Sequence, residues 1–383
     1  MQSINLQLAS YSDLFMLIAA LVYAAAFIVF AIDMATSSKT IRTLEAELAA
    51  ESGASRDASA AALQRREQLV GAGVVSQEAS AETSTEASTQ PAAGSSSAVT
   101  GRGGTGEKTG AENTDQHLVD DDMAYLGTTR RPAANVAVAL MIISVLLHAF
   151  AVIARGVSAN RVPWGNMYEF CTTGALLVAA VYLLFLIRKD LRFLGTFVSG
   201  LVVVMMCAAT MGFPTPIAHL QPALQSPWIV IHVSVAVLAS SLFGLTCAMS
   251  VLQLLQHRRE ARLRTGGEGK PAFMRLVPSA FSLENWSYRI NAVGFVMWTF
   301  TLIAGAIWAE AAWGRYWGWD TKEVWTFVIW VVYAGYLHAR ATRGWTGDRA
   351  AWLSIIGFAC LVFNFTIVNT YFPGLHSYAG IPE

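Results

Sequence analysis

The residues best suited to chemistry lie in a tryptophan-rich segment, residues 308–325, between two apolar runs. It holds five of the chain's 12 tryptophans, with Asp320 directly after one of them. A Trp ring is apolar, but its N–H needs a hydrogen-bond partner. One or two Trp residues are usual where a transmembrane helix reaches the membrane–water interface. Five rings with an acid at their edge suit a flat, largely apolar ligand with polar groups at one end, such as haem. Asp320 and Glu323 could also cap the next helix or orient Trp N–H groups. The candidate ring-contacting residues are Trp313, Trp317 and Trp319.

Two histidines could supply iron ligands for such a molecule. His232 lies one turn into an apolar run, after Ser226-Pro227-Trp228, and His376 follows the last apolar run. Both are predicted at the same membrane depth, beside the tryptophan-rich segment. Two neutral imidazoles, one on each face of a porphyrin, produce a six-coordinate haem iron. His219, in a nearby loop, could replace either one if the helices begin elsewhere.

The other histidines have different expected roles. His338 lies near the opposite end of its apolar run, a full membrane thickness from the first pair, so it requires a second haem or a structural role. His148 lies near the middle of another run, and the helical rise of 1.5 Å per residue separates it from His338 by about 15–20 Å in depth. We therefore interpret His148 as a buried polar contact in preference to a separate functional site. His117 and His257 are expected to be solvated.

The composition is that of a membrane protein. Hydrophobic residues make up 54% of the chain, charged residues make up 14%, and the mean hydropathy is +0.45. These values exclude an ordinary soluble domain, and the scattered basic residues indicate no nucleic-acid partner. The four cysteines lie in apolar runs without a C-x-x-C pair, which excludes thiol–disulfide chemistry and covalent attachment of haem to this chain.

Eight apolar segments are long enough to span a bilayer, which takes roughly 17–25 residues each. They predict an all-α fold, a polytopic integral membrane helical bundle with about eight transmembrane helices. The predicted spans are 12–33, 134–155, 169–187, 193–212, 228–255, 290–309, 324–340 and 350–371.

The basic residues predict how the chain is oriented in the cell membrane. With the N- and C-termini outside, all but four of the 26 Lys and Arg residues fall in inner segments, as the positive-inside rule requires. The tryptophan-rich segment is then extracytoplasmic. The four outer basic residues are Arg155, Arg161, Arg315 and Lys322. Two of them, Arg161 and Arg315, adjoin the motifs and could bind haem propionates, whereas Arg155 and Lys322 could equally reach membrane lipid phosphate.

Three regions are predicted along the chain. Residues 1–33 form a retained transmembrane helix, because no basic residue precedes the apolar core as in a secretory signal. Residues 34–133 are rich in Ala, Ser, Thr, Gly and Glu, which predicts a disordered cytoplasmic linker apart from a short helix at 40–50. Residues 134–383 form a seven-helix core that handles haem and contains the tryptophan-rich segment.

The chain resembles a known family at these residues. Trp313-Gly-x-x-Trp317-x-Trp319-Asp320, followed by Glu323, is similar to the WWD signature of membrane proteins that handle haem in cytochrome c maturation. Within that group the chain resembles CcsA-type subunits, called CcsB or ResC in some bacteria, of the system II cytochrome c synthase. The resemblance does not cover residues 1–130. Its further motifs are Trp164 to Phe170, Ser226-Pro227-Trp228 with His232, Tyr336-Leu337-His338, and Gly374-Leu375-His376-Ser377-Tyr378.

The resemblance implies a function and a set of ligands. His232 and His376 would ligate an outer haem b, and His338 would supply one ligand to an inner haem, giving up to two sites. The second inner ligand would come from a CcsB/ResB-type partner subunit. Haem would pass to the outer face, where its vinyl groups form thioethers with the thiols of an apocytochrome c C-x-x-C-H segment. Any attachment activity would require the complex with that partner.

Two functions from other classes fit part of the pattern. A bis-His cytochrome b in electron transfer would need paired histidines at two depths, yet His338 has no mate in this chain. A transporter of an unrelated solute would leave the outer pair, His232 and His376, unexplained.

Overall fold

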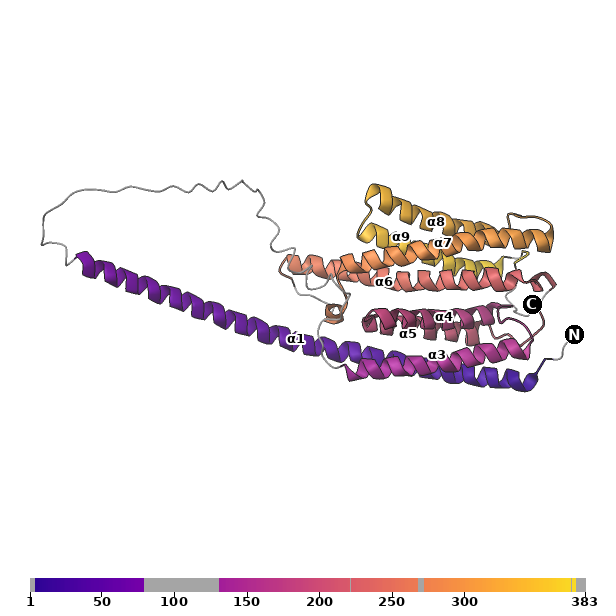
Figure 1. The fold of residues 1–383 in the computed structure, drawn as a ribbon, viewed down its shortest axis with the longest axis horizontal. Helices are drawn as coiled ribbons and strands as arrows, with labels where there is room; N and C mark the ends of the chain where they lie inside the picture. Colours follow the sequence, from indigo (N-terminus) through magenta and orange to yellow (C-terminus); the bar gives the residue numbers. More distant parts are fainter. Residues whose placement is uncertain (1–3, 79–130, 221, 268–271, 373, 377–383) are drawn as a thin grey trace, which may run out of the picture. The chain divides into compact units, whose positions relative to one another are not determined.

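The computed structural model describes residues 4–78, 131–220, 222–267, 272–372 and 374–376, and every regular element in these ranges is a helix. The chain divides into two compact units, residues 1–38 with 117–383 and residues 39–116. In the first unit, long helices lie side by side in a bundle (Figure 1). The predicted all-α class is therefore confirmed.

Seven helices follow the linker in the bundle, joined by shorter helical turns. The long helices are α3 (Pro132–Ser158), α4 (Met167–Arg188), α5 (Gly195–Cys207), α6 (Ser234–Arg264), α7 (Ala280–Trp313), α8 (Thr321–Arg343) and α9 (Asp348–Phe363). The short elements are 3-10 turns at Arg192–Leu194, Pro222–Leu224 and Ala272–Leu276, π-helical turns at Ala208–Gly212, Ile229–Val233 and Asn364–Val368, and α10 (Asn369–Tyr371).

Seven helices of the described residues are long and apolar enough to cross a membrane, which confirms a multi-pass membrane protein. They correspond to seven of the eight predicted spans. The eighth, predicted at 324–340, is α8, whose hydropathy is lowered by His338, Arg340 and several Trp and Tyr residues. Because α8 packs against both α7 and α9, it is an integral part of the bundle. The number of spans stays a prediction.

The first helix, α1 (Leu6–Glu78), is longer than the sequence predicts. Its apolar part packs on the bundle: Ser12 Oγ donates to the carbonyl of Ala151 at 2.7 Å, and the Phe30 ring fills the space beside Gly195. Residues 34–78, predicted as the start of a disordered linker with a short helix at 40–50, are helical because Ala, Glu, Leu, Arg and Gln there favour helix. Residues 79–130, the rest of the predicted linker, lie outside the described residues.

The centre of the bundle holds α6, α7 and α8 together. Phe243 of α6 stacks on Tyr333 of α8 with ring centroids 3.7 Å apart, and both side chains are fully buried. Trp298 of α7 is also buried and donates from Nε1 to the carbonyl of Thr326 at 3.1 Å. These contacts tie α7 and α8 to each other and to α6, and the tryptophan-rich segment lies where α7 and α8 are joined.

Candidate functional site

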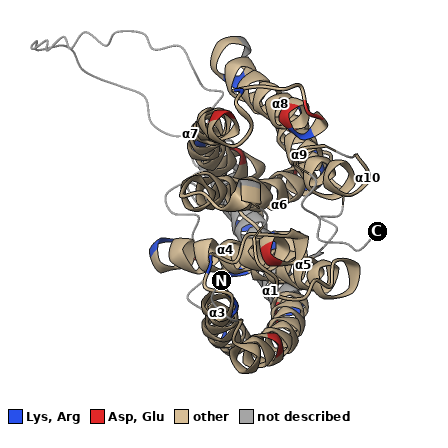
Figure 2. Cartoon of the chain, turned by 90° about the vertical axis from the view of Figure 1, so that its right-hand side faces the viewer, with Lys and Arg blue, Asp and Glu red and all other residues tan. Residues whose placement is uncertain are grey.

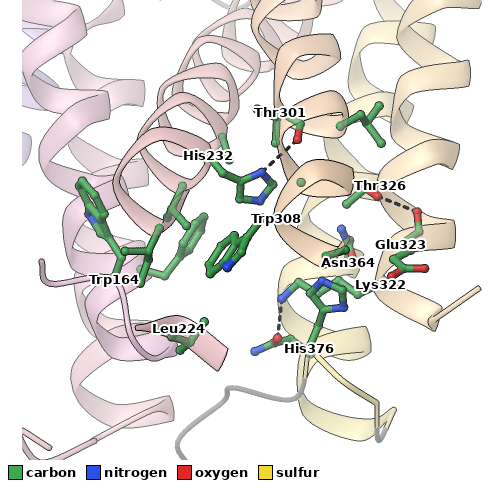
Figure 3. Close-up of a pocket in the computed structure, with 18 of the residues that line it drawn as sticks. Trp164, Leu224, His232, Thr301, Trp308, Lys322, Glu323, Thr326, Asn364 and His376 are labelled. Carbon is green, nitrogen blue, oxygen red and sulfur yellow. Dashed lines mark hydrogen bonds between the residues drawn. The ribbon is translucent and has the colours of Figure 1, made fainter. Parts of the chain in front are cut away.

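A pocket lies at the end of the bundle where α4, α6 and α8 begin and α7 ends (Figure 3). His232 and His376 both line it, and their rings approach it from different elements. Eight aromatic side chains also line the pocket, as suits a flat apolar ligand. The aromatic lining residues are Trp164, Phe170, Trp298, Trp308, Trp313, Tyr316, Trp317 and Phe365.

His232 is held by a backbone carbonyl of the neighbouring helix. It lies in the π-helical turn Ile229–Val233, a type of turn that often occurs at functional sites. Its Nδ1 is 3.0 Å from the carbonyl oxygen of Thr301 in α7. A carbonyl can only accept, so Nδ1 carries the proton and Nε2 is left as the basic nitrogen. Gly305 makes room for the ring, since a Cβ there would lie 2.8 Å from His232 Cε1.

His376 is held by the acid of the tryptophan-rich segment. Its Nδ1 donates to Asp320 Oδ2 at 2.6 Å, and its ring meets the Trp313 ring at a centroid distance of 4.8 Å. Burial lowers the pKa of His376, although the hydrogen bond to Asp320 opposes this effect. The imidazole is therefore kept neutral, with Nε2 again the nitrogen that remains available for a ligand.

The turn between α7 and α8 is fixed by its own hydrogen bonds. Gly314 ends α7 in the left-handed conformation at φ +69°, which glycine adopts without steric cost. Glu323 Oε2 then accepts the backbone N–H groups of Gly318 at 2.7 Å and Asp320 at 3.2 Å. Glu323 thus caps the start of α8, as one of the sequence interpretations proposes, and holds Asp320 beside His376.

Arg161 belongs to a buried ion cluster next to the pocket and does not line it. Arg161 contacts Glu169 at 2.7 Å and Arg155 contacts the same carboxylate at 3.0 Å. Glu169 is completely buried and also accepts the backbone N–H of Gly165 at 2.8 Å. The cluster therefore fixes the loop before α4, which carries Trp164 into the pocket wall.

Several other predicted residues also lie away from the pocket. Arg315 and His219 are exposed, and the Trp319 side chain is 78% exposed at the same end of the bundle. His338 is exposed on α8, far along the helix from Lys322. His148 is fully buried, and its Nδ1 lies 3.4 Å from the Tyr23 hydroxyl of α1, as expected for a buried polar contact.

Sequence reasoning missed the contribution of Thr301, which acts through its backbone, and of Asn364. Asn364 lines the pocket from the π-helical turn after α9 and is fully buried, and neither atom of its amide has a hydrogen-bond partner among the described residues. A signal for Asn364 was present, because a lone polar amide inside an apolar membrane run is costly and often functional. No sequence signal identifies a backbone carbonyl such as that of Thr301.

If His376 ligates a haem iron, as the sequence predicts, removing the Asp320 carboxylate should weaken the binding of haem. We expect Asp320→Ala to lower haem affinity roughly 10–100-fold, the usual effect of losing the partner that orients a histidine ligand. Asp320→Asn should lose less haem affinity than Asp320→Ala, because the Asn amide oxygen can still accept a hydrogen bond from His376 Nδ1. The measurement is a titration of the purified chain with haem, followed by absorbance. Unchanged affinity in Asp320→Ala would contradict an orienting role.

The family model and the similar sequences both point to cytochrome c assembly. A family model described as "Cytochrome C assembly protein" matches residues 164–376. The chain is similar to proteins named "Cytochrome c biogenesis protein CcsA". The one from Heterosigma akashiwo is 34% identical over 254 residues, covering 58% of this chain and 79% of that protein. The one from Synechococcus elongatus is 33% identical over 284 residues, covering 64% and 86%. A solved structure, "Cytochrome c Heme Lyase CcmF", gives a TM-score of 0.47 at 18% identity; the alignment covers 63% of this chain and 42% of that one.

Proposed function

Because this chain belongs to the cytochrome c assembly protein family, we propose that it holds haem between His232 and His376 and presents it to an apocytochrome c. The family gives the chain a role in cytochrome c maturation, a process that involves haem. An electron-transfer cytochrome b and a transporter of an unrelated solute are not favoured, since the matched family and the similar proteins are named for cytochrome c assembly.

One observation carries the proposal: two imidazoles line the same pocket, and each has its Nδ1 occupied. Thr301 and Asp320 accept those Nδ1 protons at 3.0 Å and 2.6 Å. Metal-binding histidines usually donate their other ring N–H to an oxygen in this way, which leaves both Nε2 atoms as candidate ligands. His232 and His376 would then provide the two axial ligands of haem b.

The pocket wall fits a ligand that brings hydrogen-bond acceptors. The indole N–H groups of Trp164, Trp308 and Trp317 are buried without a partner among the described residues, and all three rings line the pocket. Buried donors are normally paired, so these three fit a flat ligand with oxygen atoms at its edge. Haem has an apolar ring and two carboxylates, and when bound it supplies the vinyl groups to which cysteine thiols add.

The apocytochrome would approach at the pocket end of the bundle. Trp319 and Tyr316 are 78% and 63% exposed there, so they are free to contact another chain. This end is mostly tan in Figure 2, with few Lys and Arg residues on it. The positive-inside rule therefore supports an extracytoplasmic orientation in the cell membrane. In this proposal thioether formation takes place outside the cell.

A second haem would bind at His338 with help from a partner. Within the described part of the chain, no group of His, Cys, Asp and Glu is arranged to hold a metal ion around this residue. The His338 side chain is exposed on α8, on the same face as Phe327 and Val331. An exposed histidine on an apolar helix face suits a ligand shared with a CcsB/ResB-type membrane subunit.

His338→Ala should therefore reduce haem content only when the partner is present. We expect roughly half the haem per chain in the variant complex, because one of two sites loses a ligand. Haem is measured by absorbance per mole of protein, for the chain alone and for the copurified complex. Equal haem content with and without the partner would mean that both inner ligands belong to this chain.

Reconstitution tests the proposed function as a whole. The chain, a CcsB/ResB-type partner and an apocytochrome c are produced together in a host without its own maturation system. We expect covalent haem on the cytochrome only when both membrane proteins are present, and an absorption spectrum of the purified chain that changes on dithionite reduction. A correctly folded chain without haem absorbance would remove the proposal.

A further inference from the structure

A small polar group lies on the α8 and α9 side of the otherwise apolar pocket. Lys322, Asn364 and Asn369 all line the pocket there, as Figure 3 shows for the two labelled side chains Lys322 and Asn364. The three residues come from the start of α8, from the π-helical turn Asn364–Val368, and from α10. Because they are brought together by folding, the sequence motifs do not reveal this group.

Asn364 is the buried member of this group, and it has no partner. Its side chain is 0% exposed, yet neither Nδ2 nor Oδ1 makes a hydrogen bond within the described part of the chain. Buried amides are almost always satisfied, so an exception in a pocket wall indicates a ligand atom. The π-helical turn that begins at Asn364 interrupts α9 at this point, as such turns often do beside ligands.

Lys322 supplies a cation beside this amide. Its Nζ donates to Asn369 Oδ1 at 2.5 Å and lies 5.5 Å from the centre of the Phe365 ring. No carboxylate of the described residues forms an ion pair with Lys322. An ammonium group has three hydrogens, and only one is used by Asn369. Lys322 is partly buried and is attracted by Asp320, and an anion in the pocket would further offset the cost of withdrawing its charge from water.

We propose that Lys322 and Asn364 form a subsite that binds one carboxylate of the tetrapyrrole. The subsite rests on the proposed function, since it acts on the same ligand as His232 and His376. Lys322 contributes the charge and a hydrogen bond, and Asn364 Nδ2 contributes a second hydrogen bond. The sequence predicts Arg161 and Arg315 as partners of the haem carboxylates. Neither lines the pocket, because Arg161 is bound to Glu169 and Arg315 is exposed.

The subsite has a specific consequence for the ligand. His232 and His376 would hold the iron but would not by themselves determine how the ring is turned between them. A third fixed point, a carboxylate on Lys322 and Asn364, removes that freedom. The two vinyl groups of a bound haem would then face the two thiols in a single orientation. Lys322 and Asn364 are therefore positioning residues that select the orientation of the ring.

The test compares haem with its dimethyl ester, in which both carboxylates are neutral. The purified full-length chain is titrated with each form and binding is followed by the Soret absorbance. We expect the unmodified chain to bind the acid at least tenfold more tightly than the ester, where ~tenfold is what one charge-assisted contact contributes. Lys322→Gln should weaken acid binding and leave ester binding unchanged, while Lys322→Arg should keep most of the preference.

Asn364→Asp is the sharpest variant, because it keeps the shape of the side chain and adds a negative charge. We expect Asn364→Asp to weaken the binding of haem with free carboxylates and to leave the binding of the dimethyl ester unchanged. Lys189→Gln, at the opposite end of α4, is the matched control and should bind both forms like the unmodified chain. Equal binding of acid and ester by the unmodified chain, or equal losses for both forms in Lys322→Gln and Asn364→Asp, would overturn the subsite. Failure of the unmodified chain to bind either form would overturn the proposed function itself, and so would His232→Ala binding both forms normally.

Discussion

Replacing His232 or His376 by alanine should remove haem from the pocket and abolish cytochrome c maturation. In our proposal each imidazole would supply one ligand to the iron, and a haem held by a single imidazole would be bound more weakly and would be open to water. We expect the Soret absorbance of the purified variants to fall at least tenfold, roughly the lower limit for loss of a metal ligand. Added imidazole should restore part of the absorbance by filling the vacant position.

His219→Ala is the control for this experiment. His219 lies in the loop before the pocket, is exposed, and does not line the pocket. Its replacement should leave absorbance and maturation unchanged. Normal maturation in both His232→Ala and His376→Ala would remove the outer haem assignment, whereas loss in His219→Ala would mean that this histidine serves as a ligand in the working protein.

Glu169→Gln should give the largest loss of stability among the variants considered. Glu169 is fully buried, and the two arginine side chains bound to it are only 3% and 8% exposed. Removing the carboxylate charge leaves Arg161 without its counter-ion and Arg155 with only the exposed Asp13, and breaking a buried pair costs roughly 3–5 kcal/mol. The measurement is thermal unfolding of the detergent-solubilised protein. Haem binding should fall as well, because the weakened contacts between Arg161 and residue 169 hold the loop that carries Trp164.

Asp13→Asn is the matched control for that loss. Asp13 also contacts Arg155, at 3.4 Å, but its side chain is 63% exposed. An exposed ion pair contributes at most about 1 kcal/mol, so this variant should unfold close to the temperature of the unmodified chain. Equal unfolding temperatures for Glu169→Gln and Asp13→Asn would contradict the structural role of the cluster.

The sequence alone determined the class of the protein and the main candidates for its site. Span positions follow from the length and apolarity of local segments, and seven of the eight predicted spans meet the same test in the structure. His232, His376, Trp313 and Trp317 were expected around one ligand and all line one pocket. They could be found because membrane depth can be counted along each helix at a constant rise per residue.

The tertiary structure decided which groups act on the ligand and which support the wall. Asp320 and His376 are 56 residues apart in the chain, and His232 and the Thr301 carbonyl are 69 apart. Depth alone places Arg161 and Lys322 at the same end, but only packing shows that one is bound to Glu169 and the other faces the pocket. The physical reason is that helix rotation about its own axis is set by contacts with neighbouring helices. A sequence gives the height of a side chain in a bundle, and the fold determines the direction in which it points.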